Sequence, residues 1–241
     1  MSPGPVSSAT TRLQLFELAG ADPLRWFSPY CWRTCLALLH KGLDWETIPW
    51  RFSDQARIAP YRSRTVPVLL DGDAAIVDST VIATYLDERY PARPLLYGSA
   101  DARALGVFVH SWIDRALFPL VARMIVRDIV DILDPRDVAY FRESRERRYG
   151  TTLEAVVADR EQTRERFVKA LDPLRAMLAR QPFLGGSASN YADYMVFGVF
   201  AWARGVSTFR LLAEDDPVHA WRERILGLFG GYARAANGFE V

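Results

Sequence analysis

Cysteine and histidine are scarce in this sequence, and their positions exclude several kinds of site. Only two cysteines, Cys31 and Cys35, occur in the 241 residues, four positions apart in one predicted helix. This spacing excludes a disulfide framework and favours a reducing, cytoplasmic location. The three histidines lack the spacing of metal ligands, so no metal is expected. A G-x-S-x-G elbow and a P-loop are also absent, which excludes the hydrolase and nucleotide sites built on them.

No charge of one sign dominates, and no long apolar run is present. Thirty basic and 29 acidic side chains give a formal net charge of +1, so nucleic acid is not an expected partner. The mixed-sign stretch RESRERR at residues 142–148 is interpreted as a solvated helix face. The longest apolar run, residues 194–203, is shorter than the roughly 20 residues that cross a bilayer, which predicts a buried helix and no membrane partner.

Strand and helix patterns alternate in the first part of the chain. Residues 1–12 are rich in proline, glycine, serine and threonine and lack the apolar segment of a signal peptide, so a disordered leader is predicted. Strands are then expected at residues 13–18, 45–50, 66–70 and 74–77, the last two joined by an Asp-Gly-Asp hairpin. Helical spacing follows Pro29 and returns around residues 82–89, which gives the order βαβ-ββα.

From residue 101 onward the pattern changes to long helices. The expected fold class is therefore an α+β domain of thioredoxin-like topology followed by an all-helical domain. The predicted boundaries are residues 13–91 for the first domain, 92–100 for a linker and 101–241 for the second domain.

Four short motifs follow one another in this frame: SPYCWR at residues 28–33, TVPVL at 65–69, Asp78-Ser79 before a helix, and NYAD at 190–193. Together they resemble the glutathione transferase superfamily of cytosolic type. Within it, the loop at residues 21–23 and the segment QPFLGG at 181–186 look most like the bacterial β-etherase-like and fungal etherase-type members, some of which cleave β-aryl ethers with glutathione. The resemblance implies glutathione as co-substrate and a homodimer.

Ser28 is the predicted catalytic residue. It would lie at the N-cap of the first helix, where unpaired N–H groups and the helix dipole favour negative charge. Glutathione is a good nucleophile only as its thiolate, and the resemblance implies that the Ser28 hydroxyl donates a hydrogen bond to that sulfur. Taken from the residues alone, a simple helix cap is the alternative.

The glutathione site is predicted around the second and third motifs. The resemblance implies a cis bond before Pro67, which would let the backbone of Val66 pair with the cysteinyl part of the tripeptide. Ser79 and Asp78 would receive the glutamyl carboxylate and ammonium, although an ordinary N-cap would also explain both. Three further residues are assigned to the glycyl end, with a plain surface position as their alternative: Gln55, Arg64 and Thr65.

A pocket for the second substrate is expected between the domains. The residues predicted to line it, for which a place in the core is the alternative, are Trp26, Phe27, Tyr30, Cys31, Trp112 and Phe118. Cys31 has the second position of a redox C-x-x-C motif whose first cysteine is replaced by Ser28, which argues against thiol–disulfide exchange. Asn190 and Asp193 are expected to form a structural capping box.

The sequence therefore predicts a glutathione S-transferase that activates glutathione as a thiolate for attack on a hydrophobic electrophile, with β-aryl ether cleavage as one such reaction. Two alternatives stay open. One is a protein that binds glutathione or a hydrophobic ligand without turnover, and the other is a glutathione-dependent thiol reductase that uses Cys31.

Overall fold

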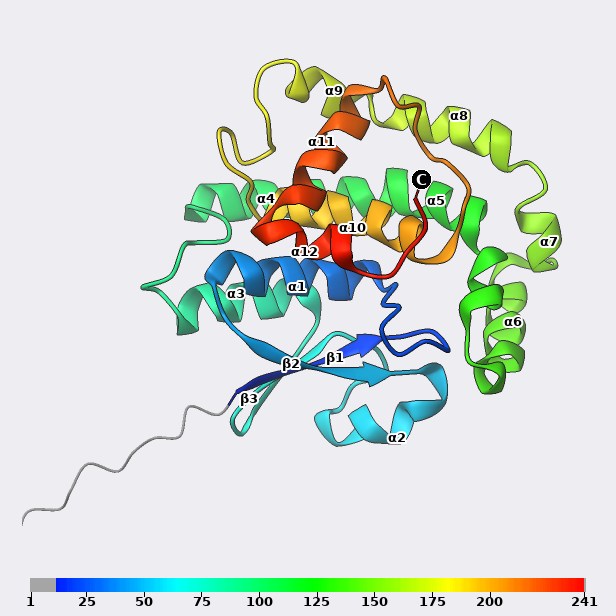
Figure 1. Ribbon diagram of the computed structural model, residues 1–241, viewed down its shortest axis with the longest axis horizontal. Helices are drawn as coiled ribbons and strands as arrows, with labels where there is room; N and C mark the ends of the chain where they lie inside the picture. The colour runs from blue at the N-terminus through cyan, green and yellow to red at the C-terminus, as the bar shows by residue number, and fades with distance from the viewer. Residues whose placement is uncertain (1–11, 241) are drawn as a thin grey trace, which may run out of the picture.

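A single mixed sheet organises the first part of the chain (Figure 1). The structure is a computed structural model that describes residues 12–240, so the predicted leader lies outside the described residues except for Arg12. The sheet has four strands in the order β2-β1-β3-β4. Their bounds are β1 (Leu13–Leu18), β2 (Trp45–Trp50), β3 (Val68–Asp71) and β4 (Ala74–Val77). β1 runs parallel to β2 and antiparallel to β3, and β3 and β4 form the predicted hairpin.

Two helices cover the face of the sheet that is turned toward the rest of the molecule. They are α1 (Pro29–Lys41) and α3 (Ser79–Arg89), while the short α2 (Gln55–Ile58) lies on the opposite side of the sheet in Figure 1. The 3₁₀ turns η1 (Phe52–Asp54) and η2 (Ala59–Tyr61) flank α2. The predicted βαβ-ββα order is confirmed, but β3 begins at Val68 rather than at residue 66, because Val66 and Pro67 belong to the turn that precedes it.

The remainder is helical, and no strand forms between residues 100 and 240, all of which the structure describes. The longer helices are α4 (Ala100–Trp112), α5 (Phe118–Ile125), α6 (Pro135–Tyr149), α8 (Arg160–Ala170), α10 (Tyr191–Val206) and α11 (Pro217–Gly227). The shorter ones are α7 (Leu153–Val156), α9 (Asp172–Leu178) and α12 (Tyr232–Ala235). A π-helical turn η3 (Ile113–Leu117) and the 3₁₀ turns η4 (Asp128–Ile132) and η5 (Phe229–Gly231) complete the set. The predicted fold class is confirmed.

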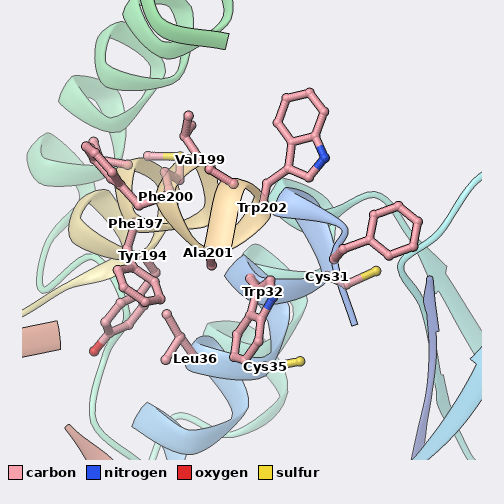
Figure 2. Close-up of a cluster of buried hydrophobic side chains, with 14 of the residues drawn as sticks. Cys31, Trp32, Cys35, Leu36, Tyr194, Phe197, Val199, Phe200, Ala201 and Trp202 are labelled. Carbon is pink, nitrogen blue, oxygen red and sulfur yellow. The ribbon is translucent and has the colours of Figure 1, made fainter. Parts of the chain in front are cut away.

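Helix α10 runs through the centre of the molecule and packs along α1. Every residue of α10 except Arg204 is buried, as its apolar sequence predicts. Figure 2 shows side chains of the two helices packed side by side, among them Leu36 of α1 and Phe197 of α10. A Cβ atom at Gly198 would lie 2.5 Å from the carbonyl oxygen of Pro29, so only glycine allows this close approach. The contact fixes the N-terminus of α1 against α10.

A capping box holds the start of α10. The Asn190 side chain accepts a hydrogen bond from the amide of Ala192, and the Asp193 carboxylate accepts one from the amide of Asn190 at 3.0 Å. The same buried carboxylate also accepts hydrogen bonds from the Leu184 amide and from the indole of Trp221, each at 2.9 Å. The predicted structural role of the box is confirmed.

Glu17 on β1 is a buried acid at the centre of the first part of the chain. It is 1% exposed, and its oxygens accept hydrogen bonds from the Cys35 thiol at 2.6 Å and the Thr47 hydroxyl at 2.7 Å. Burial raises the pKa of the Glu17 carboxyl from 4.5 to about 7, against the opposing effect of these donors. The folded protein therefore holds this proton more tightly than the unfolded chain does.

This pKa shift predicts a loss of stability as pH rises. Between the unfolded pKa of 4.5 and the folded pKa of about 7, the native state binds more protons than the unfolded chain, so the free energy of unfolding falls across that window. We expect wild type to lose on the order of 3 kcal/mol from about pH 4.5 to about pH 8 beyond what Glu17→Gln loses. Urea denaturation of both proteins across that range measures the difference, and parallel pH profiles would contradict the prediction.

Candidate functional site

A cavity of about 540 Å³ opens between the sheet and the helices of the second part. Its walls come from the start of α1, the loop around η1 and α2, the turn before β3, the start of α3, and helices α4, α5, α6 and α10. All eight residues predicted to bind glutathione line it: Ser28, Gln55, Arg64, Thr65, Val66, Pro67, Asp78 and Ser79. Residues far apart in the sequence thus meet in one hollow.

Ser28 caps α1 at the floor of this cavity. It is 4% exposed, has extended backbone angles, and its hydroxyl oxygen accepts a hydrogen bond from the Cys31 amide at 3.2 Å. Pro29 follows at the first helical position, where its missing N–H leaves no bond unmade. Ser28 is therefore a helix cap, as its structural alternative predicts, and it also lines the cavity together with Pro29 at the start of the helix.

The turn before β3 forms one side of the site. The Val66–Pro67 peptide bond is cis, as the resemblance implied, and both residues line the cavity. Next to them, the Gln55 amide donates a hydrogen bond to the carbonyl of Arg64 at 3.1 Å. This bond ties the start of α2 to the segment that carries Arg64 and Thr65.

The start of α3 presents unused hydrogen-bonding capacity to the cavity. Asp78 has a left-handed backbone conformation, with φ of 79°, and its carboxylate accepts hydrogen bonds from the amides of Thr80 and Val81 at 2.8 and 3.1 Å. The Ser79 hydroxyl is buried and has no hydrogen-bond partner among the described residues. Since a buried hydroxyl without a partner is costly, this group suits a ligand oxygen. The Ser79 carbonyl accepts a hydrogen bond from Tyr191 of α10 at 2.7 Å.

The opposite side of the cavity is aromatic. Phe118 stacks on Trp202 with ring centroids 4.7 Å apart, and Tyr30 lies 5.9 Å from Phe118. The guanidinium of Arg33, which is fully buried, lies over the Tyr30 ring at 4.6 Å from its centroid. Burial raises the pKa of Tyr30, so its hydroxyl stays protonated near neutrality.

Three of the residues predicted for the second-substrate pocket line this cavity, and three do not. Phe27, Tyr30 and Phe118 line it, whereas Trp26, Cys31 and Trp112 lie elsewhere. Trp26 pairs with Ala19 through its backbone and borders a small pocket between α1 and α10. His110 of α4 and Asp114 of η3 line the cavity, whereas Trp112 does not, because helix residues two apart are separated by about 200° around the axis.

Cys31 lies on the sheet side of α1, 1% exposed, with its thiol 3.9 Å from the carbonyl of Phe16. Figure 2 shows the sulfur atoms of Cys31 and Cys35 on that side of the helix. Burial, reinforced by the charge of Glu17, raises the pKa of the Cys31 thiol to about 12. A buried thiol with a raised pKa is a poor nucleophile, which argues against the reductase alternative.

The sequence did not identify most of the far wall. Further cavity residues come from the loop after β2 and from α4, η3, α6 and α10: Phe52, His110, Asp114, Tyr140, Phe141, Arg145, Arg148, Tyr149 and Trp202. Two arginines of the stretch predicted as a solvated helix face are among them. The helical spacing of Phe141, Arg145 and Tyr149 was the available signal, because residues four apart share one side of a helix.

Comparison with known proteins identifies the family. A family model described as Glutathione S-transferase, N-terminal domain, matches residues 26–94, and one described as Glutathione S-transferase, C-terminal domain, matches residues 104–223. The two models together match more than half of the chain. The chain belongs to the glutathione S-transferase family.

Curated relatives agree with this assignment. Glutathione S-transferase Z1 of Arabidopsis thaliana is 44% identical over 87 residues, which cover 33% of this chain and 38% of that protein. Glutathione S-transferase U28 of the same plant is 24% identical over 206 residues, which cover 83% of this chain and 80% of that protein. The chain spans less than half the length of the first of these relatives.

Solved glutathione S-transferases share the fold. One from Ceriporiopsis subvermispora, in complex with glutathione, matches with a TM-score of 0.82 at 24% identity and covers 92% of this chain and 98% of that chain. A glutathione transferase from Phanerochaete chrysosporium matches with a TM-score of 0.75 at 22% identity, covering 94% and 95%. Among residues 12–240, no group of three or more histidine, cysteine or acidic side chains could hold a metal ion.

In this member of the glutathione S-transferase family, one buried carboxylate connects the far wall to the sheet. Asp137 of α6 is 1% exposed and accepts hydrogen bonds from the amides of Phe52 at 3.1 Å and Ser53 at 2.8 Å. These amides begin η1, directly after β2. The two bonds therefore set where α6, and with it the far wall, lies over the cavity.

Replacing Asp137 by asparagine should destabilise the protein. Asparagine keeps one acceptor oxygen but places an NH₂ group against the second amide, so we expect the free energy of unfolding to fall by about 1–3 kcal/mol. Urea denaturation measures this change. The matched control is Asp131→Asn, whose side chain is 64% exposed and pairs with Arg127, and whose loss should stay below about 1 kcal/mol. Equal losses in both variants would contradict the role given to Asp137.

Proposed function

We propose that this protein is a glutathione transferase that binds glutathione in the described cavity and presents its thiolate to an aromatic electrophile. The observation that supports this proposal most strongly is a single hollow with two unlike halves. One half has a helix N-terminus, a cis Val-Pro turn and an unpartnered buried hydroxyl, while the other is lined by aromatic rings. A polar half beside an aromatic half suits one charged and one hydrophobic substrate.

Glutathione would lie along the sheet side of the cavity. Its glutamyl carboxylate would meet the start of α3 and the free hydroxyl of Ser79, with the ammonium near Asp78. Its cysteinyl backbone would pair with Val66 as an added strand. The glycyl carboxylate would then reach the segment of Gln55, Arg64 and Thr65, which includes a cation.

The sulfur would lie at the start of α1. The Ser28 oxygen already accepts the Cys31 amide, so its proton is available to donate toward sulfur. Donation to the charged form and the helix N-terminus both favour the thiolate. The thiolate attacks the electrophilic carbon, a C–S bond forms, and the leaving group departs with the electron pair of the broken bond. Proximity of the two bound substrates provides much of the rate.

We propose cleavage of an aryl ether as one reaction of this site. If the electrophilic carbon carries an aryloxy group, the C–O bond breaks and a phenolate leaves, which takes up a proton from solvent. The resemblance of residues 21–23 and 181–186 to etherase-type transferases supports this reaction, and the aromatic wall suits such a leaving group. A carrier that binds glutathione without turnover is the second candidate, since Ser28 also has a purely structural role as a cap.

The first test is Ser28→Ala. Removing the hydroxyl should lower kcat on the order of 10²-fold while glutathione affinity changes little, because the lost bond acts on the sulfur. The pKa of the bound thiol should rise, which thiolate absorbance in the ultraviolet measures. Unchanged kcat and thiol pKa would leave Ser28 as a cap only.

A matched control separates capping from catalysis. Ser99 caps α4 in the same way, with its hydroxyl accepting the Ala102 amide at 3.1 Å, and it does not line the cavity. Ser99→Ala should lose about 1 kcal/mol of stability, as Ser28→Ala should, but keep full activity. Wild-type protein that binds glutathione yet turns over no electrophile would favour the carrier.

The proposed assembly is a homodimer in the cytoplasm. Both cysteines are free and buried, which suits a reducing compartment. The stretch Ala100–Ile125 is long and apolar enough to cross a membrane, by length and composition alone, and only 22% of its apolar window is buried. On α4, Leu105 and Phe108 are 69% and 73% exposed and share one side of the helix. We assign this apolar side to a second copy of the chain, because such side chains are depleted from free surfaces.

Light scattering tests the dimer. Wild type should show twice the mass of one chain, and Leu105→Glu combined with Phe108→Glu should show the mass of one chain, because two like charges would be buried at the interface. Leu24→Glu is the control, since Leu24 is 60% exposed in the loop before α1 and should leave the dimer intact. A wild-type mass of one chain would contradict the assembly.

A further inference from the structure

The arginines of α6 divide into two groups. Arg136 pairs with Asp134, Arg142 with Glu146 and Glu154, and Arg147 with Glu143. Arg145 and Arg148 have no acidic partner within ion-pair distance among residues 12–240, and these are the two arginines of this group that line the cavity. The cavity side of α6 therefore presents positive charge without a counter-ion.

Arg145 is the more enclosed of the two. Its guanidinium lies over the rings of Phe141 and Phe52, at 4.9 and 5.7 Å from their centroids, and donates one hydrogen bond to the Ser144 hydroxyl at 2.9 Å. Burial lowers the pKa of Arg145, but a guanidinium stays charged in proteins. Arg145 is half-buried, and four of its five N–H groups have no acceptor among the described residues, so they are available to an anion in the cavity.

Of the other charged groups that line the cavity, the two carboxylates have partners, and Arg64 belongs to the segment proposed for the glycyl end of glutathione. The Asp78 carboxylate accepts two amides of α3, and Asp114 lies 3.4 Å from His110 on α4. The two carboxylates of glutathione have proposed places at α3 and at the segment of Gln55 and Arg64. Arg145, on the aromatic side, is thus left for the second substrate.

We propose that the second substrate is an aromatic electrophile that carries a carboxylate, and that Arg145 is the residue that selects it. The inference rests on the proposed transferase function. The substrate ring packs against the aromatic wall, and its carboxylate accepts two parallel N–H bonds from the guanidinium. Arg148, one turn further along α6, adds positive charge at the more exposed end.

The test compares two electrophiles of similar shape, of which only the first carries a negative charge: 4-chloro-3-nitrobenzoate and 4-chloro-3-nitrobenzamide. With either, the C–S bond forms, the C–Cl bond breaks, chloride leaves with the electron pair, and the thiol proton goes to solvent. The readout is the ratio of kcat/KM for the carboxylate to that for the amide, each divided by its uncatalysed rate with glutathione. We expect wild type to prefer the carboxylate by about tenfold or more.

Three substitutions separate the effect of Arg145 on the rate ratio from that of a neighbouring arginine. Arg145→Gln should lower the ratio about tenfold or more, and Arg145→Lys should restore part of it, because a lysine keeps the charge without the planar fork. Arg147→Gln is the matched control, since Arg147 lies on the same helix, is exposed and pairs with Glu143. Its ratio should equal that of wild type.

Two results of this comparison would overturn the inference. A ratio unchanged in Arg145→Gln, even with both rates lowered, would make Arg145 structural. A raised KM for glutathione with an unchanged ratio would assign it to the glycyl carboxylate. If wild type turns over neither compound, tryptophan fluorescence decides the inference, whereas failure of the proposed function would be a lack of turnover of every electrophile, β-aryl ethers included. Benzoate analogues that bind more tightly than their amides to wild type, but not to Arg145→Gln, would support it, and equal binding would reject it.

Discussion

The close contact between α1 and α10 is the constraint on which the rest of the site depends. Gly198 lets the two helices approach until a Cβ atom would meet the carbonyl of Pro29, and this fixes the first turn of α1. Helix α10 also contacts α3, because the Tyr191 hydroxyl of α10 donates a hydrogen bond to the carbonyl of Ser79. The buried apolar length of α10 thus positions both ends of the proposed glutathione site. Trp202 of the same helix contributes to the aromatic side.

Charge is distributed unequally around the cavity, and this gives its two halves different chemistry. On the sheet side, polar groups are supplied by a helix N-terminus, amides and hydroxyls, which suit a peptide with charges at both ends. On the helical side, aromatic rings surround an arginine that has no acidic partner among the described residues. Asp137 holds these halves together through the amides of Phe52 and Ser53, so the shape of the pocket depends on one buried carboxylate.

Local features could be predicted well from the sequence, but the side of a long helix that meets the cavity could not. The strands at residues 13–18, 45–50 and 74–77 and the capping box at Asn190 follow from patterns of a few residues, which local physics decides. The proposed glutathione residues lie in turns and helix starts that carry their own motifs. The α6 wall was missed because RESRERR has the charge pattern of a solvent face, and whether Arg145 meets solvent or cavity depends on how α6 is docked. Of the residues predicted for the second-substrate pocket, Trp26, Cys31 and Trp112 do not line this cavity. Trp26 lies in the loop before α1, and the other two lie on helices whose docking the sequence does not fix.

Every step of the proposed reaction requires glutathione to lie in this cavity with its sulfur at Ser28. A crystal structure of the protein with glutathione tests this most directly. We expect the sulfur to lie within hydrogen-bonding distance of the Ser28 hydroxyl, the glutamyl carboxylate on Ser79 and the cysteinyl backbone paired with Val66. A cavity without glutathione at saturating concentration, or a bound tripeptide whose sulfur points away from Ser28, would contradict it.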